Sequence, residues 1–90
     1  MQRWYLSQCD EDWEHQYGVR IDTLDNPGWS IEVDLYPTDL ESASFEAVKI
    51  ERSESDWIQA RLEEFKWKAF CGPLNLGEAL TIFLDWAEPG

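Results

Sequence analysis

Two runs of alternating apolar and polar residues flank a turn in the first third of the chain. The first run covers residues 17–23 and the second covers residues 29–35, with Asp25-Asn26-Pro27-Gly28 between them. Alternation of this kind is typical of a half-buried β-strand. The Pro-Gly pair favours a turn in which Gly28 adopts a positive φ. The pattern therefore predicts a β-hairpin with one apolar face.

The two faces of this hairpin differ in chemistry. The apolar face carries Tyr17, Val19, Ile21, Thr23, Trp29, Ile31, Val33 and Leu35, and the polar face carries Gly18, Arg20, Asp22, Ser30, Glu32 and Asp34. A sheet with one apolar side must bury that side beneath another element. We expect four residues near the strand centres to hold the domain together. They are Val19, Ile21, Ile31 and Val33.

Helical periodicity marks both ends of the chain. Residues 1–9 place apolar side chains at helical spacing along one side, starting with Trp4, which predicts a short helix. Isolated helices of this length are marginal in water, so we expect it to dock on the sheet. Residues 76–87 carry a broader apolar stripe after Asn75, a favourable N-cap, and Glu78 is placed for a capping box. This pattern predicts a longer helix over the apolar face.

The middle of the chain contains a further strand and an ambiguous segment. Pro37 lacks the N–H that a strand interior needs, so the second hairpin strand should end there. Residues 45–52 alternate again and predict a third strand. Residues 57–70 fit either a helix, which their propensity favours, or a strand. We predict a strand, because the polar turn at residues 53–56 suits a meander and a fourth strand would cover an exposed edge. Residues 65–70 either continue it after a bend or form a short further strand.

These elements predict an α+β fold. We expect an antiparallel sheet of about four strands in meander order, a short N-terminal helix, and a C-terminal helix packed on one face. A chain of 90 residues suits a single domain, residues 1–90, with a small core.

The charge of the chain restricts its partners. Nineteen acidic and seven basic residues give a net charge of −12, which repels nucleic acid and anionic lipid and attracts basic surfaces. We therefore expect no direct binding to nucleic acid or membrane. The simpler interpretation is that the charge only keeps a small protein soluble. The chain has no apolar run long enough for a signal peptide or a membrane span, which predicts a cytoplasmic location.

Potential metal ligands gather between Cys9 and His15. Their spacing matches no zinc pattern, and the chain contains no second histidine. A Cys–His nucleophile needs the two side chains within about 3 Å, which this spacing does not ensure. Cys71 and Cys9 are most simply reduced thiols. We expect no metal, cofactor or enzymatic activity. The alternative is a small metal- or thiol-dependent enzyme built on Cys9, Asp12 and His15.

Several motifs along the chain carry a family resemblance. They are Trp4-Tyr5, Cys9-Asp10, Asp12-Trp13-Glu14-His15, Tyr17-Gly18, Thr23-Leu24-Asp25-Asn26-Pro27-Gly28-Trp29, Asn75-Leu76 and Phe83-Leu84-Asp85-Trp86. Together they resemble the immunity protein 53 family of bacterial polymorphic toxin systems over nearly the whole chain. The resemblance implies a single immunity-protein-like domain that binds a cognate toxin domain and blocks it, without being an enzyme. It leaves the oligomeric state open.

Seven carboxylates form the candidate toxin-binding surface. They are Asp10, Glu11, Asp12, Glu14, Asp22, Glu32 and Asp34. The last three share the polar face of the hairpin, where complementary charge would speed the encounter with a basic partner. Our hypothesis is that this surface occludes the active site of a nuclease-type toxin by mimicking its phosphate substrate. The alternatives are a solvated sheet face and an acidic adaptor or nucleic-acid mimic unconnected to toxins.

Overall fold

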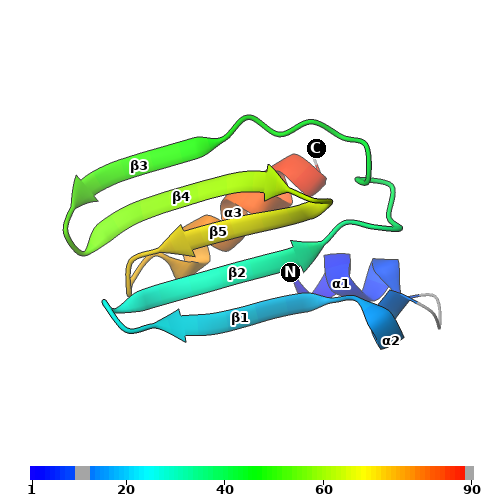
Figure 1. Cartoon of the computed structure of the whole chain (residues 1–90), viewed down its shortest axis with the longest axis horizontal. Helices are drawn as coiled ribbons and strands as arrows, with labels where there is room; N and C mark the ends of the chain where they lie inside the picture. The colour runs from blue at the N-terminus through cyan, green and yellow to red at the C-terminus, as the bar shows by residue number, and fades with distance from the viewer. Residues whose placement is uncertain (10–12, 89–90) are drawn as a thin grey trace.

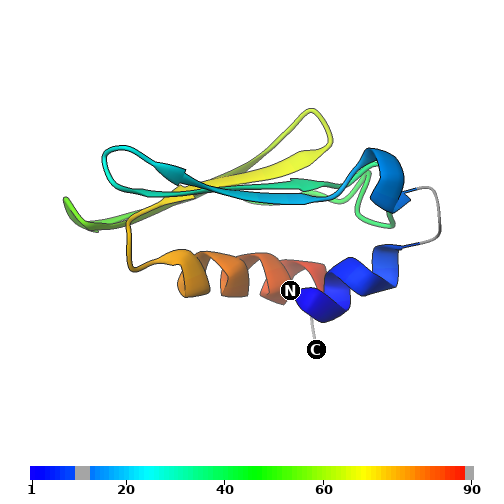
Figure 2. The same cartoon turned by 90° about the horizontal axis from the view of Figure 1, so that it is seen from below.

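The computed structural model describes residues 1–9 and 13–88 and combines one sheet with two helices on one side of it and a short helix at its end (Figures 1 and 2). The helices are α1 (Gln2–Gln8), α2 (Trp13–Gln16) and α3 (Leu76–Ala87), and the strands are β1 (Val19–Leu24), β2 (Gly28–Asp34), β3 (Val48–Ser53), β4 (Asp56–Glu63) and β5 (Lys66–Cys71). All neighbouring strands are antiparallel. The predicted α+β fold and both terminal helices are confirmed, and the sheet has five strands instead of about four.

The strand order β1-β2-β5-β4-β3 is not the predicted meander. β1 and β2 form the expected hairpin, with Ile21 opposite Ile31. The chain then crosses to the far edge as β3 and returns through β4 to β5, which pairs with the second edge of β2. The physical reason is burial: β2 and β5 contribute the most deeply buried residues, such as Val33 and Trp67, and so occupy the centre. A local pattern does not encode this long-range pairing.

The ambiguous segment at residues 57–70 is strand, as predicted. Of the two alternatives left open for its second half, the separate further strand is the one observed, as β5. In β4 the buried residues Ile58 and Ala60 alternate with the more exposed Gln59 and Arg61. In β5 the buried residues again fall at every second position. Burial with a period of two therefore overrides the helical propensity of this segment.

Aromatic side chains form the core between the sheet and the helices. The ring of Phe83 on α3 lies 4.9 Å from Trp4 of α1 and 5.1 Å from Trp67 of β5, measured between ring centres. Trp4 also meets Trp13 of α2 at 6.0 Å. These edge-to-face contacts dock the short helix α1, as expected for an element too short to be stable alone. None of the helices among residues 1–9 and 13–88 has the length and hydrophobicity to span a lipid bilayer.

The hairpin is only half covered. Ile31 and Val33 of β2 are buried, which confirms the prediction for that strand. Ile21 of β1 is 40% exposed and Val19 is half-buried, so the prediction that they hold the domain together is wrong for Ile21 and only partly right for Val19. The cause is the position of β1 at the sheet edge, whereas α3 runs beneath the central strands (Figure 1).

Asn75 is the N-cap residue of α3, but its side chain does not cap the helix. Its Oδ1 accepts a hydrogen bond from the backbone N–H of Trp57 at 3.3 Å, and its Nδ2 donates to Asp56 at 2.9 Å and to Glu78 at 3.4 Å. The predicted capping box is therefore wrong. The buried Asn75 side chain instead forms hydrogen bonds with residues of β4, and these bonds fix the start of α3 to the sheet.

Candidate functional site

The sheet face opposite α3 has no helix over it in the described part of the chain (Figure 2). We call it the open face. The strand registers assign to it Arg20, Asp22, Ser30, Glu32, Asp34, Lys49, Glu51, Trp57, Gln59, Arg61, Glu63, Lys66, Lys68 and Phe70. All three hairpin carboxylates proposed from the sequence lie on it.

The open face is charge-balanced although the protein is strongly acidic. It carries five of the seven basic residues of the chain, namely Arg20, Lys49, Arg61, Lys66 and Lys68. It also carries five of the nineteen acidic residues, namely Asp22, Glu32, Asp34, Glu51 and Glu63. The excess negative charge is therefore carried by other parts of the sequence. The hairpin by itself shows three carboxylates and one arginine, and Lys66 and Lys68 of β5 compensate the difference. β3 and β4 each add one cation and one carboxylate.

Glu32 is the centre of an ion-pair network on the open face. Lys66 Nζ lies 2.8 Å from Glu32 Oε1, and Arg20 Nη1 lies 3.3 Å from the same oxygen. The hydrogen bond from Lys66 is the main cause of a lowered Glu32 pKa, and the same bond raises the pKa of Lys66. These contacts hold both side chains across the β2–β5 pair and fix their orientation.

Asp34 and Asp22 differ in accessibility. Asp34 is only 3% exposed, and its Oδ2 accepts a hydrogen bond from the backbone N–H of Gly18 at 2.9 Å. Arg20 lies 3.6 Å from Asp34, so this carboxylate ties the end of β2 to the start of β1 and orients a cation. Asp22 is exposed and faces Ser30. Of the three hairpin carboxylates, Asp22 is the one most accessible to a partner.

The remaining sequence candidates belong to the segment before β1. Asp10, Glu11 and Asp12 lie outside the described residues, and Glu14 is half-buried in the first turn of α2. Helix α2 lies at the end of the sheet where β2 ends (Figure 1). Glu14 therefore extends the acidic surface at that end.

Of the residues considered for catalysis, Cys9 and His15 lie outside the open face, and Asp12 lies outside the described residues. His15 is exposed on α2, and Cys9 Sγ donates to the carbonyl oxygen of Tyr5 at 3.4 Å. Cys71 is buried, and burial raises the pKa of its thiol. Across residues 1–9 and 13–88, no three Cys, His, Asp or Glu side chains gather in a geometry that could hold a metal ion.

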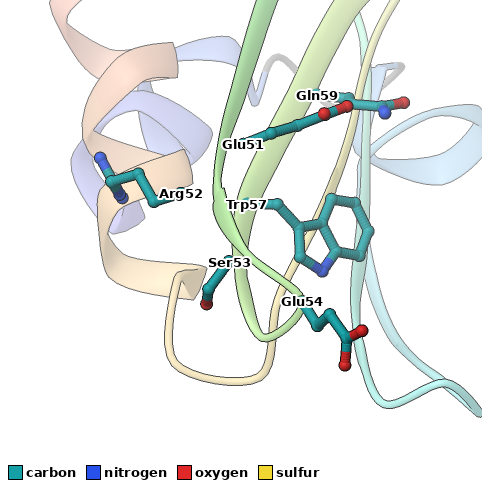
Figure 3. A pocket seen from close by; sticks show the side chains of 6 residues that line it. All are labelled: Glu51, Arg52, Ser53, Glu54, Trp57 and Gln59. Carbon is teal, nitrogen blue, oxygen red and sulfur yellow. The ribbon is translucent and has the colours of Figure 1, made fainter.

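A hollow of about 410 Å³ opens beside Trp57 near the start of β4 (Figure 3). The indole ring is flanked by Glu51 and Gln59 on one side and by Glu54 on the other, while Arg52 points away from it toward α3. Further along the same strand the Arg61 guanidinium lies 5.6 Å from the centre of the Phe70 ring. Trp57 was not a candidate in the sequence analysis. The signal for it was the strand alternation, which places Trp57 on the same side as Gln59.

Arg52 joins the sheet to α3 through two carboxylates. Its Nη2 lies 2.9 Å from Asp56 Oδ1 and 2.6 Å from Glu78 Oε1. The hydrogen bonds from Arg52 are the main cause of lowered pKa values at Asp56 and Glu78, and they raise the pKa of Arg52. This cluster lies on the helix side of the sheet, so it supports the fold.

Acid should remove the contribution of this cluster to stability. Asp56 and Glu78 have ordinary pKa values of 3.8 and 4.5, and both values are lowered in the folded protein. As the pH falls below the ordinary pKa values, these two carboxyl groups take up protons in the unfolded chain before they do so in the folded protein. The stabilisation is therefore complete above about pH 5 and is lost as the pH falls through the pKa values of the folded protein. In urea titrations, Arg52→Gln should therefore lose less stability than the wild type between about pH 6 and about pH 3.

Lys49→Gln is the matched control for this prediction, because it removes one positive charge from the exposed pair of Lys49 with Glu51. Both variants change the net charge equally, so general charge repulsion affects them alike. The same pH dependence in Arg52→Gln and Lys49→Gln would contradict the assignment.

Comparison with protein families identifies the chain. A family model described as immunity protein 53 matches residues 1–88 of the 90 residues. The chain belongs to the immunity protein 53 family. Membership in an immunity family indicates toxin neutralisation in general, and such proteins are generally non-enzymatic. Neither a curated protein nor a solved structure matches the chain.

The motifs that resemble the immunity protein family lie mainly on the helix side of the sheet. Trp4 and Trp13 are buried, and Trp29 Nε1 donates to the carbonyl oxygen of Pro73 at 3.1 Å. Trp86 Nε1 donates to the carbonyl oxygen of Ser44 at 2.8 Å. In this immunity protein these residues hold elements of the fold together.

Proposed function

We propose that this immunity protein binds a cognate toxin domain in the cytoplasm and occludes its active site as a stoichiometric, non-catalytic partner. The observation that carries the proposal is the open face, a sheet surface without helical cover in the described residues. Its charged side chains are already held by ion pairs such as that of Glu32 with Lys66. Side chains ordered before binding lose less entropy on association, which favours tight binding.

The charge distribution supports a basic toxin surface as the partner. The net charge of −12 attracts such a surface from a distance, whereas the open face itself is balanced. On the open face, Asp22 and Glu32 are the proposed contacts, and Asp34 supports them by orienting Arg20. Four further carboxylates extend the proposed surface beyond the open face. They are Asp10, Glu11, Asp12 and Glu14.

We propose a nuclease-type activity for the toxin. A groove that binds phosphates carries the basic residues that an acidic protein attracts. Carboxylates such as Asp22 would then take the places of phosphate groups in that groove. Measuring DNA and RNA cleavage by the purified toxin tests this part alone. Absence of cleavage would contradict the nuclease activity but not the proposal that the active site is occluded.

Co-expression with the open reading frame beside the gene tests the proposal as a whole. We expect that frame to arrest growth alone and this protein to restore growth through a one-to-one complex. Growth arrest without rescue would contradict the function.

Charge reversal tests the surface. Asp22→Lys, on the open face, should weaken toxin binding by about tenfold or more, as expected for a contact residue. Asp85→Lys changes the net charge equally but lies on α3, and it should mainly slow association. Titration calorimetry and association kinetics measure both effects. Equal affinities for the two variants would exclude Asp22 as a contact with the toxin.

A further inference from the structure

Two exposed aromatic rings and one half-buried ring surround a small hollow at the end of the open face that lies beside α2. The hollow has a volume of about 190 Å³ and is lined by Tyr17, Asp34, Tyr36, Glu64, Phe65 and Lys66. The Tyr36 ring lies 6.0 Å from Tyr17 and 6.1 Å from Phe65, measured between ring centres. We call this site the aromatic hollow. No candidate from the sequence analysis other than Asp34 lies in it.

The rings of the aromatic hollow are poorly buried by the fold. Phe65 is 58% exposed and Tyr36 is 45% exposed. By contrast, the aromatic residues on the helix side, such as Trp67 and Phe83, are fully buried. Rings that contribute little to the core are typical of protein interfaces, where Tyr, Phe and Trp are enriched in the contact centre.

The backbone at the hollow is strained. Glu64 and Phe65 form the two-residue connection between β4 and β5, and both have positive φ, at 50° and 63°. Such a turn favours Asn-Gly, because other side chains are disfavoured in the left-handed region. The backbone N–H of Leu35 donates to the carbonyl oxygen of Phe65 at 2.8 Å and holds the turn in place. Strain of this kind is typical of functional sites. Figure 2 shows the turn, in yellow, rising on the side of the sheet away from α3.

The charges of the hollow favour a cation. Glu64 is exposed and forms no ion pair with the described residues. The ammonium group of Lys66 is directed to Glu32 at 2.8 Å, so its charge is already compensated. A lysine or arginine side chain can place its aliphatic stem against the rings, where cation–π attraction adds to the pull of a carboxylate.

We infer that the aromatic hollow receives one lysine or arginine side chain of the toxin and anchors the complex. This inference rests on the proposed function, because the toxin is the partner. It adds a specific anchor outside the carboxylates proposed from the hairpin. The inference also gives the two unfavoured residues of this turn a role, because Glu64 supplies the charge and Phe65 the ring that the anchor requires.

The decisive variant is Glu64→Asn/Phe65→Gly. It introduces the residues that the turn favours, so the melting temperature should stay the same or rise. It removes a carboxylate and a ring from the hollow, so toxin binding should weaken by about tenfold or more. A residue pair that serves only the fold would give the opposite result, a lower melting temperature with unchanged affinity. That result would overturn the inference.

Two further variants identify the occupant. Tyr36→Leu keeps apolar area but removes the π system, so it should weaken binding of a cation and spare an apolar side chain. Glu64→Gln should weaken binding more than Glu46→Gln, which removes one negative charge outside the hollow. Retained affinity in Tyr36→Leu and equal affinities in the two glutamine variants would show that the occupant is not a cation.

The outcome for the wild-type protein separates this inference from the proposed function. If the wild type binds the toxin and Glu64→Asn/Phe65→Gly binds equally well, the anchor is wrong and the function stands. If the wild type does not bind the toxin, both fail.

Discussion

Replacing Phe83 with alanine should lower the free energy of unfolding by about 3–5 kcal/mol. Phe83 is fully buried, and its ring contacts Trp4 of α1, Trp67 of β5 and Trp86 of α3. It therefore joins both terminal helices to the sheet. A domain of this size is stable by only about 5–15 kcal/mol, so the variant should lose a large fraction of its total stability. Urea denaturation followed by tryptophan fluorescence measures the change.

Leu74→Ala is the control for Phe83→Ala, because Leu74 is 93% exposed. Its replacement should change stability by no more than about 0.5 kcal/mol. If Phe83→Ala cost no more than Leu74→Ala, the aromatic cluster could not be the core that docks α1. Circular dichroism of Phe83→Ala would further show whether the helices are lost together, as a shared core requires.

Most elements of the fold were predictable because they follow local patterns, and the four-residue helix α2 is an element that was not predicted. Alternation identified the hairpin, and helical spacing identified α1 and α3, since each periodicity reflects burial of one face. The strand order was not predictable in the same way. Pairing of Ile31 with Ala69 joins residues far apart in the chain, and the sequence of neither segment indicates which strand it pairs with. The exposure of Ile21 follows from that order, because it depends on which strands α3 covers.

The candidate site was only partly predictable for the same reason. The sequence showed Asp22, Glu32 and Asp34 on one face, and the register confirms that they share it. Two of the cations that compensate the hairpin carboxylates, Lys66 and Lys68, come from β5, whose position beside β2 was missed. The strained turn at residues 64–65 was also missed, because it contains neither Gly nor Asn. A turn that lacks its favoured residues leaves no local signal.

The helix side and the open face carry different chemistry. Buried rings hold the helices, so replacing them should lower the unfolding free energy more than the toxin affinity. Exposed rings and paired charges occupy the other side, so replacing them should lower the toxin affinity more than the unfolding free energy. Toxin affinity and unfolding free energy, measured on the same variants, should therefore separate the two classes.

Gly28→Ala should destabilise the protein by about 3 kcal/mol or more, although it adds only one methyl group. A Cβ atom at Gly28 would lie 2.3 Å from the backbone carbonyl oxygen of Cys71. The obstacle is backbone of the neighbouring strand β5, so no side-chain movement can relieve it. Gly28 does not have the positive φ that the turn pattern predicted, and it is required for the close approach of the two strands. Urea denaturation measures the loss.

Two variants distinguish close approach from backbone conformation. Gly77→Ala is the positive control, because a Cβ there meets nothing within 4 Å and alanine favours the helix, which should stabilise by about 0.5 kcal/mol. Gly28→Asn tests whether backbone conformation or lack of space requires glycine at position 28. Asparagine tolerates a positive φ, so it would be accepted if φ were the constraint. Since the constraint is space beside Cys71, Gly28→Asn should be at least as harmful as Gly28→Ala. If Gly28→Asn were about as stable as the wild type, the conformation of the turn, and not the space beside Cys71, would explain the glycine.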